Sequence, residues 1–225
     1  MAAQLPLVVT ASEHANRKER ARRLDALAGE LLAALAPLSF ELVRTTADRD
    51  AALRLRYECM LEFGWLRPED YPDGRAADEY DREALLVVGK DGGEAVSSMR
   101  VVPPDPVRPL PVERECGIPL RARDGVFEFG RLSVPRRHRP GRSHLLIAGL
   151  CARGWIESRA RGCVRAISSA TPELIDLYRG LGLQVAVLGP AHLYSGEQRV
   201  PIEFTGADAS TPMLARQPSS GSDSS

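Results

Sequence analysis

Apolar positions at helical spacing predict a helix over residues 11–36 that Ser12 can cap and that ends at Pro37. These positions are Leu24, Leu27, Leu31, Leu32 and Leu35. Thr171 and Pro172 have the residue types preferred at a helix start. Helical spacing predicts three further long or medium helices, over residues 47–66, 143–161 and 172–180. A single helical turn is also expected over 112–116.

Short segments with alternating or continuous apolar residues predict seven strands between these helices. The turn sequence DGG separates two of them, so these two form a hairpin. The predicted strands cover residues 40–45, 84–89, 95–102, 126–134, 164–168, 184–188 and 200–204, and the last two are expected to pair. Residues 67–82 are rich in Pro, Gly and Asp and are expected to form a loop.

The order of these elements indicates one α+β domain around a mixed sheet, because strands do not alternate regularly with helices as in a doubly wound fold. We divide the chain into an N-terminal helical extension over residues 1–37 and a domain over 38–205. Residues 206–225 are a low-complexity segment, and we predict a disordered C-terminal tail.

The charge balance excludes a global attraction to nucleic acid or to a membrane surface. The 30 Lys and Arg residues equal the 30 Asp and Glu residues. The four cysteines form no C-x-x-C pair, which argues against a structural metal site and a disulfide scaffold. No apolar run reaches transmembrane length, and the start of the chain lacks the basic region of a signal peptide. We therefore expect a cytoplasmic protein with reduced thiols.

The predicted strand over 126–134 carries two charges, Glu128 and Arg131, on either side of Gly130. Side chains three positions apart normally point to opposite faces of a sheet, but a bulge at the glycine would turn both to one face. There they would either pair with each other or line a pocket beside the bulge. A plain ion pair on an edge strand is the alternative.

A basic loop follows this strand and leads into the helix that begins near Ser143. A helix N-terminus offers unpaired N–H groups, and Gly141 allows close backbone approach, which together suit a phosphate. The cationic or polar residues of the loop are Arg136, Arg137, His138, Arg139 and Arg142. The alternative is a solvated basic loop.

Five segments occur in an order typical of a known enzyme family. They are LRYECMLEFGWL (55–66), DEYD (78–81), SSMRVVPP (97–104), EFGRLSV (128–134) and GPAHLYSGEQRVPIEF (189–204). Between Phe40 and Phe204 the chain resembles the acyl-homoserine-lactone (autoinducer) synthases, the long-chain N-acyl amino acid synthases and the exosortase-associated acyltransferases. The loop HRPGRS is a degraded form of the acyl-CoA loop of GNAT N-acyltransferases.

The resemblance implies a three-layer α/β/α GNAT-like fold, with a mixed, mostly antiparallel, twisted sheet and a bulged central strand at 126–134. The charged and aromatic positions of the family pattern fall on Arg56, Trp65, Asp78, Asp81, Arg100, Glu128 and Arg131. These residues either frame the amine substrate or, because isolated buried charge is costly, only hold the 67–82 loop on the sheet. Met60 departs from the autoinducer-synthase pattern, and the spacing from Arg56 to Trp65 favours the N-acyl amino acid synthase and exosortase-associated relatives.

Acyl transfer to an amine requires a base near the amine, N–H donors for the thioester oxygen and an acid for the leaving thiolate. We assign Glu128 as the base, the bulge near Gly130–Leu132, which includes Arg131, as the oxyanion site, and Tyr178 as the acid, with a core tyrosine as the alternative. Ser168 and Ser169 either bind the pantetheine arm or acyl carbonyl, or cap the next helix. The donor-binding residues are expected to be Leu132, Val134, Arg137, His138, Arg139, Gly141, Arg142 and Ser143.

The expected function is transfer of a fatty acyl group from an acyl carrier protein, or from CoA, to the amine of an amino acid or similar acceptor. The single glycine and many arginines of the loop favour acyl carrier protein. The alternatives are an autoinducer synthase that uses S-adenosylmethionine, and a binding module without turnover. We expect no permanently bound cofactor, no metal and no nucleic-acid partner, and the oligomeric state stays open.

Overall fold

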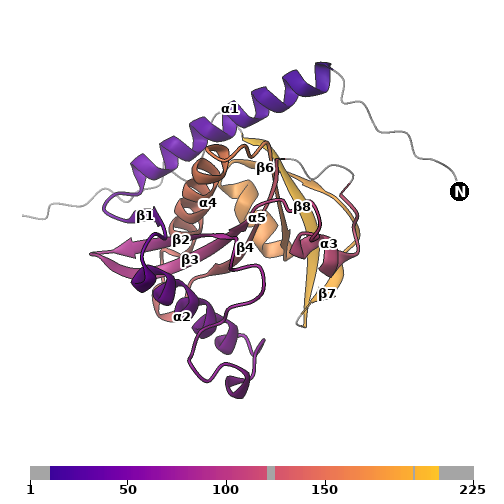
Figure 1. The fold of residues 1–225 in the computed structure, drawn as a ribbon. Helices are drawn as coiled ribbons and strands as arrows, with labels where there is room; N and C mark the ends of the chain where they lie inside the picture. Colours follow the sequence, from indigo (N-terminus) through magenta and orange to yellow (C-terminus); the bar gives the residue numbers. More distant parts are fainter. Residues whose placement is uncertain (1–10, 121–124, 195, 208–225) are drawn as a thin grey trace, which may run out of the picture.

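The computed structural model describes residues 11–120, 125–194 and 196–207, with side chains from Asn16 onward (Figure 1). The helices are α1 (Ala11–Ala34), α2 (Thr46–Glu62), α3 (Pro111–Cys116), α4 (Ser143–Arg159) and α5 (Pro172–Gly180). The strands are β1 (Ser39–Leu42), β2 (Leu85–Asp91), β3 (Glu94–Val102), β4 (Val126–Ser133), β5 (Arg165–Ala170), β6 (Leu183–Val187), β7 (His192–Tyr194) and β8 (Glu197–Ala207). Two 3-10 turns, Pro68–Asp70 and Arg136–His138, complete these elements.

The strands form one sheet in the order β1-β2-β3-β4-β5-β8-β6, and β7 pairs with the outer part of β8. Among the described strands, β4 and β5 are the one parallel pair, and all other neighbours are antiparallel. Helices α4 and α1 cover one face and α2 packs on the other (Figure 1). The predicted fold class, a mostly antiparallel sheet between helical layers with β4 at its centre, is therefore confirmed.

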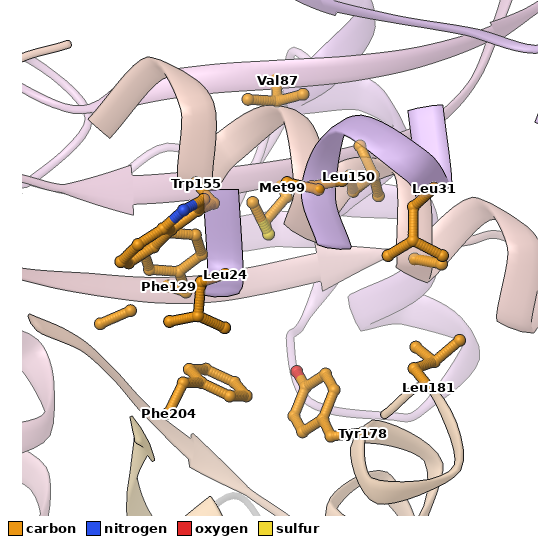
Figure 2. Packing of buried hydrophobic residues seen from close by; sticks show 14 of the residues in the cluster. Leu24, Leu31, Val87, Met99, Phe129, Leu150, Trp155, Tyr178, Leu181 and Phe204 are labelled. Atoms are coloured by element: carbon orange, nitrogen blue, oxygen red, sulfur yellow. The ribbon is translucent and has the colours of Figure 1, made fainter. Parts of the chain in front are cut away.

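The main core lies between the sheet and the layer formed by α4 and α1. Phe127 is buried there. Figure 2 shows Val87 and Leu150 of the same cluster, to which α1 adds Leu24 and Leu31. The carboxylate of Asp25 in α1 accepts hydrogen bonds from Trp155 Nε1 at 2.7 Å and Arg159 Nε at 3.1 Å, both in α4. The predicted N-terminal helix thus packs on the core, whereas the domain boundary that we placed at residue 37 stays a prediction.

The sequence located the helices well but misplaced several ends. Thr45, assigned to a strand, is the N-cap of α2, and its side chain accepts from the N–H of Asp48 at 3.0 Å. Helix α2 was expected to reach residue 66 but ends at Glu62, because Gly64 adopts a left-handed φ of 70°. The predicted cap of α5 is confirmed, since Thr171 Oγ1 accepts from the N–H of Leu174 at 3.4 Å.

The predicted bulge exists, but Gly130 is not its extra residue. Gly130 pairs regularly with Arg100, and the register then shifts so that Arg131 and Leu132 together lie opposite Met99. Arg131 takes the left-handed conformation, with φ 53°, and is the one non-glycine residue with positive φ in the described chain. That conformation costs roughly 1–2 kcal/mol for a residue with a Cβ atom, so contacts of the Arg131 side chain must offset it.

The last strand is longer than expected, and a further short strand precedes it. The predicted pairing of the last two strands is confirmed as β6 with β8, but β8 runs over Glu197–Ala207 rather than 200–204, and β7 was not predicted. Gly206 and Ala207 belong to β8, so the boundary at 206 was wrong. The rest of the expected tail, residues 208–225, lies outside the described residues.

Two glycines of α4 permit the helix to lie close to the sheet. A Cβ atom on Gly149 would come within 2.1 Å of the Phe40 ring, and one on Gly154 within 2.4 Å of Met99 Cε. Since such contacts are far below van der Waals distance, a larger residue at Gly149 must displace a buried ring. The close approach of α4 to β1 therefore depends on glycine at this position.

We predict that Gly149→Ala lowers the free energy of unfolding by about 1–3 kcal/mol, because it overpacks the core against Phe40. Gly29→Ala is the matched control: it lies in α1 with no atom within 4 Å of the new Cβ, so it should stabilise by roughly 0.5–1 kcal/mol. Urea denaturation of both variants measures the difference. Equal effects would show that the Gly149 contact does not limit packing.

Candidate active site

A cleft opens where the parallel strands β4 and β5 separate. Their ladder pairs Val126 with Arg165 and ends with Glu128 opposite Ile167. Beyond this point β4 continues to Ser133 and β5 to Ala170, but the two strands no longer pair with each other. A cleft of about 410 Å³ lies between them. The backbone of β4 after Glu128 therefore borders an open space instead of a neighbouring strand.

Most of the residues proposed from the sequence meet at this cleft. Those that line it are Arg56, Trp65, Arg100, Glu128, Arg131, Leu132, Val134, Arg139, Ser143, Ser168, Ser169 and Tyr178. Asp78, Asp81, Arg137, His138, Gly141 and Arg142 do not line it. The two aspartates lie directly behind it, paired with arginines that do.

These arginines and aspartates form one connected ion network. Arg56 Nη1 donates to Asp81 Oδ2 at 2.7 Å, and Arg100 Nη1 lies 3.5 Å from the same oxygen. Arg100 Nη1 also donates to Asp78 Oδ1 at 2.5 Å, and Arg131 Nη2 lies 3.3 Å from Asp78 Oδ2. The network joins α2, β3 and the bulge of β4 to the 67–82 loop.

The network is largely buried, so each of its charges needs an opposite charge close by. The side chains of Arg56 and Arg100 are 3% exposed and that of Asp81 is 2% exposed. Burial opposes ionisation of Asp78, but the hydrogen bond and charge of Arg100 and the charge of Arg131 hold its pKa well below its usual range. Arg131 also donates to the hydroxyl of Tyr194 at 3.1 Å, so both contacts hold the left-handed residue in place.

Glu128 stands apart from these ion pairs. Its carboxylate accepts the N–H of Val112 at 2.8 Å, from α3, and no salt bridge with Arg131 forms in the described structure. Burial raises the pKa of Glu128 to about 8, although the Val112 hydrogen bond and the charges of Arg100 and Arg131 oppose the shift. Glu128 and Arg131 thus both line the cleft, as expected from the bulge, while Arg131 pairs with Asp78 and Tyr194.

Aromatic rings line the same cleft as the bulge. The rings of Phe63 and Trp65 are stacked at 4.5 Å, and Arg199 lies 5.1 Å from the Trp65 ring and 5.5 Å from that of Tyr194. The sequence analysis did not assign Tyr194 or Arg199 to the site. The signal was present, because both occur in the closing segment GPAHLYSGEQRVPIEF that we had quoted for the family resemblance.

The basic loop before α4 is largely neutralised by acidic residues. Arg137 pairs with Glu58, Arg139 Nη2 with Glu62 Oε2 at 2.9 Å, and Arg142 with Asp91. The amides of Arg142 and Ser143, expected to be free, both donate to the carbonyl of Arg139 at 3.1 Å. Within the described structure, this loop is therefore less open to a phosphate than the sequence indicated.

Tyr178 and the two serines lie on the β5 side of the cleft. Tyr178 is buried, and burial raises the pKa of its hydroxyl well above the usual value. Ser168 is buried at the end of the β4–β5 ladder, and its Oγ donates to the carbonyl of Ser169 at 3.4 Å. Thr171, rather than either serine, caps α5, so the capping alternative for Ser168 and Ser169 is wrong.

A Cys–His pair that the sequence did not suggest joins α3 to β7. Cys116 Sγ lies 3.3 Å from His192 Nε2. Burial raises the pKa of the Cys116 thiol to about 12, which leaves it protonated and a poor nucleophile. In the described parts of the chain, no cluster of three or more His, Cys, Asp or Glu side chains is arranged to hold a metal ion.

The sequence from residue 51 to residue 201 matches the family model of the N-acyl amino acid synthase FeeM. The chain belongs to this family. No curated protein matches it. Acyl transfer to an amine is the activity of the family and of this enzyme.

Solved structures show the same fold. FeeM, an N-acyl amino acid synthase from uncultured soil microbes, is 15% identical with a TM-score of 0.57, over 74% of this chain and 90% of that one. TofI, in a ternary complex with an inhibitor and MTA, is 20% identical with a TM-score of 0.59, over 79% and 95%. BjaI, a CoA-dependent acyl-homoserine lactone synthase with SAM and isopentyl-CoA, is 21% identical with a TM-score of 0.56, over 71% and 76%.

None of the described helices is long and apolar enough to cross a membrane.

We predict that Asp81→Asn lowers the free energy of unfolding by about 3–5 kcal/mol, since it leaves the buried Arg56 without its counter-charge. The control is Glu19→Gln, which removes the exposed ion pairs with Arg22 and Arg23 and should cost under about 1 kcal/mol. Thermal and urea denaturation provide both values. A cost for Asp81→Asn as small as that of the control would mean that water reaches Arg56.

Proposed function

We propose that this enzyme transfers a fatty acyl group from an acyl carrier protein thioester to the amino group of an amino acid. The observation that carries the proposal is the position of Glu128, a buried carboxyl group that lines the cleft beside the end of the β4–β5 ladder. Its raised pKa, about 8, makes its carboxylate a base strong enough to accept a proton from an amine near neutral pH. No nucleophilic side chain is required for this reaction.

In the proposed reaction the acceptor amine gives a proton to Glu128, directly or through a water molecule, and its nitrogen attacks the thioester carbonyl carbon. The carbonyl oxygen becomes negative and is stabilised by N–H groups of β4 after Glu128, where β5 no longer pairs with it. The C–S bond then breaks. Tyr178 lines the cleft with its hydroxyl protonated, and it gives this proton to the departing thiolate, which becomes a thiol. The proton that Glu128 took from the amine then returns through water to the Tyr178 oxygen, so both groups regain their starting forms.

The charge balance of the ion network supports an amino acid as acceptor. Among the described residues, the ion pairs of Arg56, Arg100 and Arg131 are with Asp78 and Asp81 alone, so this network has one more arginine than aspartate. The Nε groups of Arg56 and Arg100 have no hydrogen-bond partner among the described residues, and both side chains line the cleft. A substrate carboxylate would balance this charge and accept from these donors.

The loop before α4 supports acyl carrier protein over CoA as the donor. A CoA pyrophosphate needs several free backbone N–H groups at a helix start, and here the amides of Arg142 and Ser143 are used by the turn itself. Arg136 and Arg137 are exposed at the mouth of the loop, where an acidic carrier protein could reach them. The phosphopantetheine arm would then enter between β4 and β5.

We expect Glu128→Gln to reduce kcat about 10²–10⁴-fold, because the amide cannot take the amine proton but keeps the hydrogen bond from Val112. In the wild-type enzyme kcat should rise with pH and level off above about 8, since the base acts as the carboxylate. The variant should lose this rise. An unchanged pH profile would exclude Glu128 as the base.

A second measurement for Glu128→Gln does not depend on activity. The fold raises the pKa of Glu128, so its stabilising contribution is complete at low pH and is lost as the pH rises through about 8. The wild-type free energy of unfolding should therefore fall between pH 5 and 9 more than that of the variant. The pH dependence of stability therefore tests the pKa of Glu128, and the pH dependence of kcat tests its catalytic role.

Acyl carrier protein and CoA thioesters of the same acyl chain, each mixed with the amino acids or with S-adenosylmethionine, test the substrates by mass spectrometry. The expected product is an N-acyl amino acid, formed with a lower KM from the carrier protein. Arg136→Glu should raise KM for the carrier-protein donor roughly tenfold without a comparable effect for CoA. Arg22→Glu, on the exposed side of α1, is the control. A lactone product, or turnover from CoA alone, would overturn the corresponding part of the proposal.

A further inference from the structure

A second, smaller cavity lies on the face of the sheet that α1 and α4 cover. Its volume is about 40 Å³, and its lining is almost entirely apolar. Leu24, Leu27 and Leu31 of α1 form one wall, and Trp155 of α4 and Phe204 of β8 form others. We call this cavity the α1 chamber. A cavity with such walls does not hold water well, but it can accept an apolar group.

The chamber and the active-site cleft share one lining residue. Phe129, the residue after Glu128 in β4, lines both cavities. Tyr178 lines the cleft, and its ring lies edge-on at 5.0 Å from that of Phe204, which lines the chamber. Figure 2 shows Phe129 beside Leu24 and Trp155, with Phe204 and Tyr178 across from them.

The backbone leaves a passage at the same place. The β4–β5 ladder ends at Glu128 and Ile167, so beyond these residues no ladder joins the two strands, and the cleft lies between them. A flexible chain that begins at the thioester beside Glu128 can therefore pass between the strands if the Phe129 ring turns aside. Beyond Phe129 it meets the α1 chamber.

The helix that closes the chamber lies outside the matched family region, which begins at residue 51. It is nevertheless held firmly, because Asp25 accepts hydrogen bonds from Trp155 and Arg159 of α4. The wall of the chamber is thus supplied by a segment that the family pattern does not specify.

We propose that the α1 chamber receives the terminal methylene groups of the acyl chain and that α1 sets the longest chain the enzyme accepts. This inference rests on the proposed function, since it assigns the far end of the same donor. The chamber volume suits about three methylene groups, at roughly 10–15 Å³ of such volume for each water-sized group. The leucines of α1 are the stop against which the chain end packs.

Binding can be tested without turnover, because one of the two tryptophans lines each cavity: Trp155 the chamber and Trp65 the cleft. Acyl carrier protein thioesters whose acyl chains carry bromine atoms on the last two carbons should quench Trp155, and the same chains brominated next to the thioester should not. The comparison with Trp155→Phe identifies which tryptophan is quenched. Absence of Trp155 quenching by any tail-labelled chain, at concentrations where head-labelled chains bind, would overturn the inference.

Chain selectivity tests the role of α1 itself. Ala28→Leu fills the chamber, and it should shift the preferred length in a series of C6 to C18 thioesters down by about three carbons, with at least tenfold slower turnover of the longest wild-type substrate. Leu31→Ala should shift the preference to longer chains. The control is Ala26→Leu, the same change on the exposed face of the same helix, which should leave the preference unchanged.

These outcomes distinguish the two proposals. If no acceptor is acylated, the proposed function fails, but tail-dependent quenching of Trp155 still decides whether the chamber binds acyl chains. If acylation occurs and Ala28→Leu, shown to be folded by its melting temperature, has the wild-type chain preference, α1 does not limit the chain.

Discussion

The structure depends on the separation of two neighbouring parallel strands. Strands β4 and β5 pair as far as Glu128 and Ile167 and then diverge, so the centre of an otherwise continuous sheet has an opening. Backbone amides, a buried carboxyl group and apolar side chains from both faces of the sheet meet there. A flat sheet of the same strands would bury these groups against each other and leave no room for a thioester.

Charges are kept in this opening because they neutralise one another. Each aspartate of the network contacts two arginines, and the loop that carries both aspartates is thereby attached to α2 and β3. Asp78 stays ionised in this environment, whereas Glu128, which forms no ion pair with an arginine within the described structure, is shifted toward the neutral form. Two carboxyl groups of the same cluster therefore have different roles, set by their neighbours.

The sequence was sufficient for the elements and for much of the site. Helical spacing and strand alternation depend on near neighbours, and they located every long helix and the central strand. The bulge was also predictable, but not its residue: glycine is the usual choice, whereas here Arg131 takes the strained conformation because Asp78 and Tyr194, 53 and 63 positions away, hold its guanidinium group. No local pattern contains that information.

The basic loop was misjudged for the same reason. Its arginines read as free positive charge in the sequence, but Arg137 and Arg139 pair with Glu58 and Glu62, which α2 brings to them from more than seventy positions away. Similarly, Arg199 reaches the site through a hairpin of β7 and β8, and the first of these strands is too short for an alternation pattern. Contacts between distant segments decided each of these differences.

Because α1 packs on the core, the apolar interior and the reacting groups come from different segments of the chain. The groups that contact the reacting atoms come from the middle of the sequence, whereas the helix over Ala11–Ala34 touches the core through a row of leucines and one aspartate. A substitution in that row alters the shape of the apolar interior and leaves every charged group of the cleft in place. Descendants of this enzyme could therefore diverge in the lipids they make through changes in a single helix, while the bond-forming chemistry stays constant.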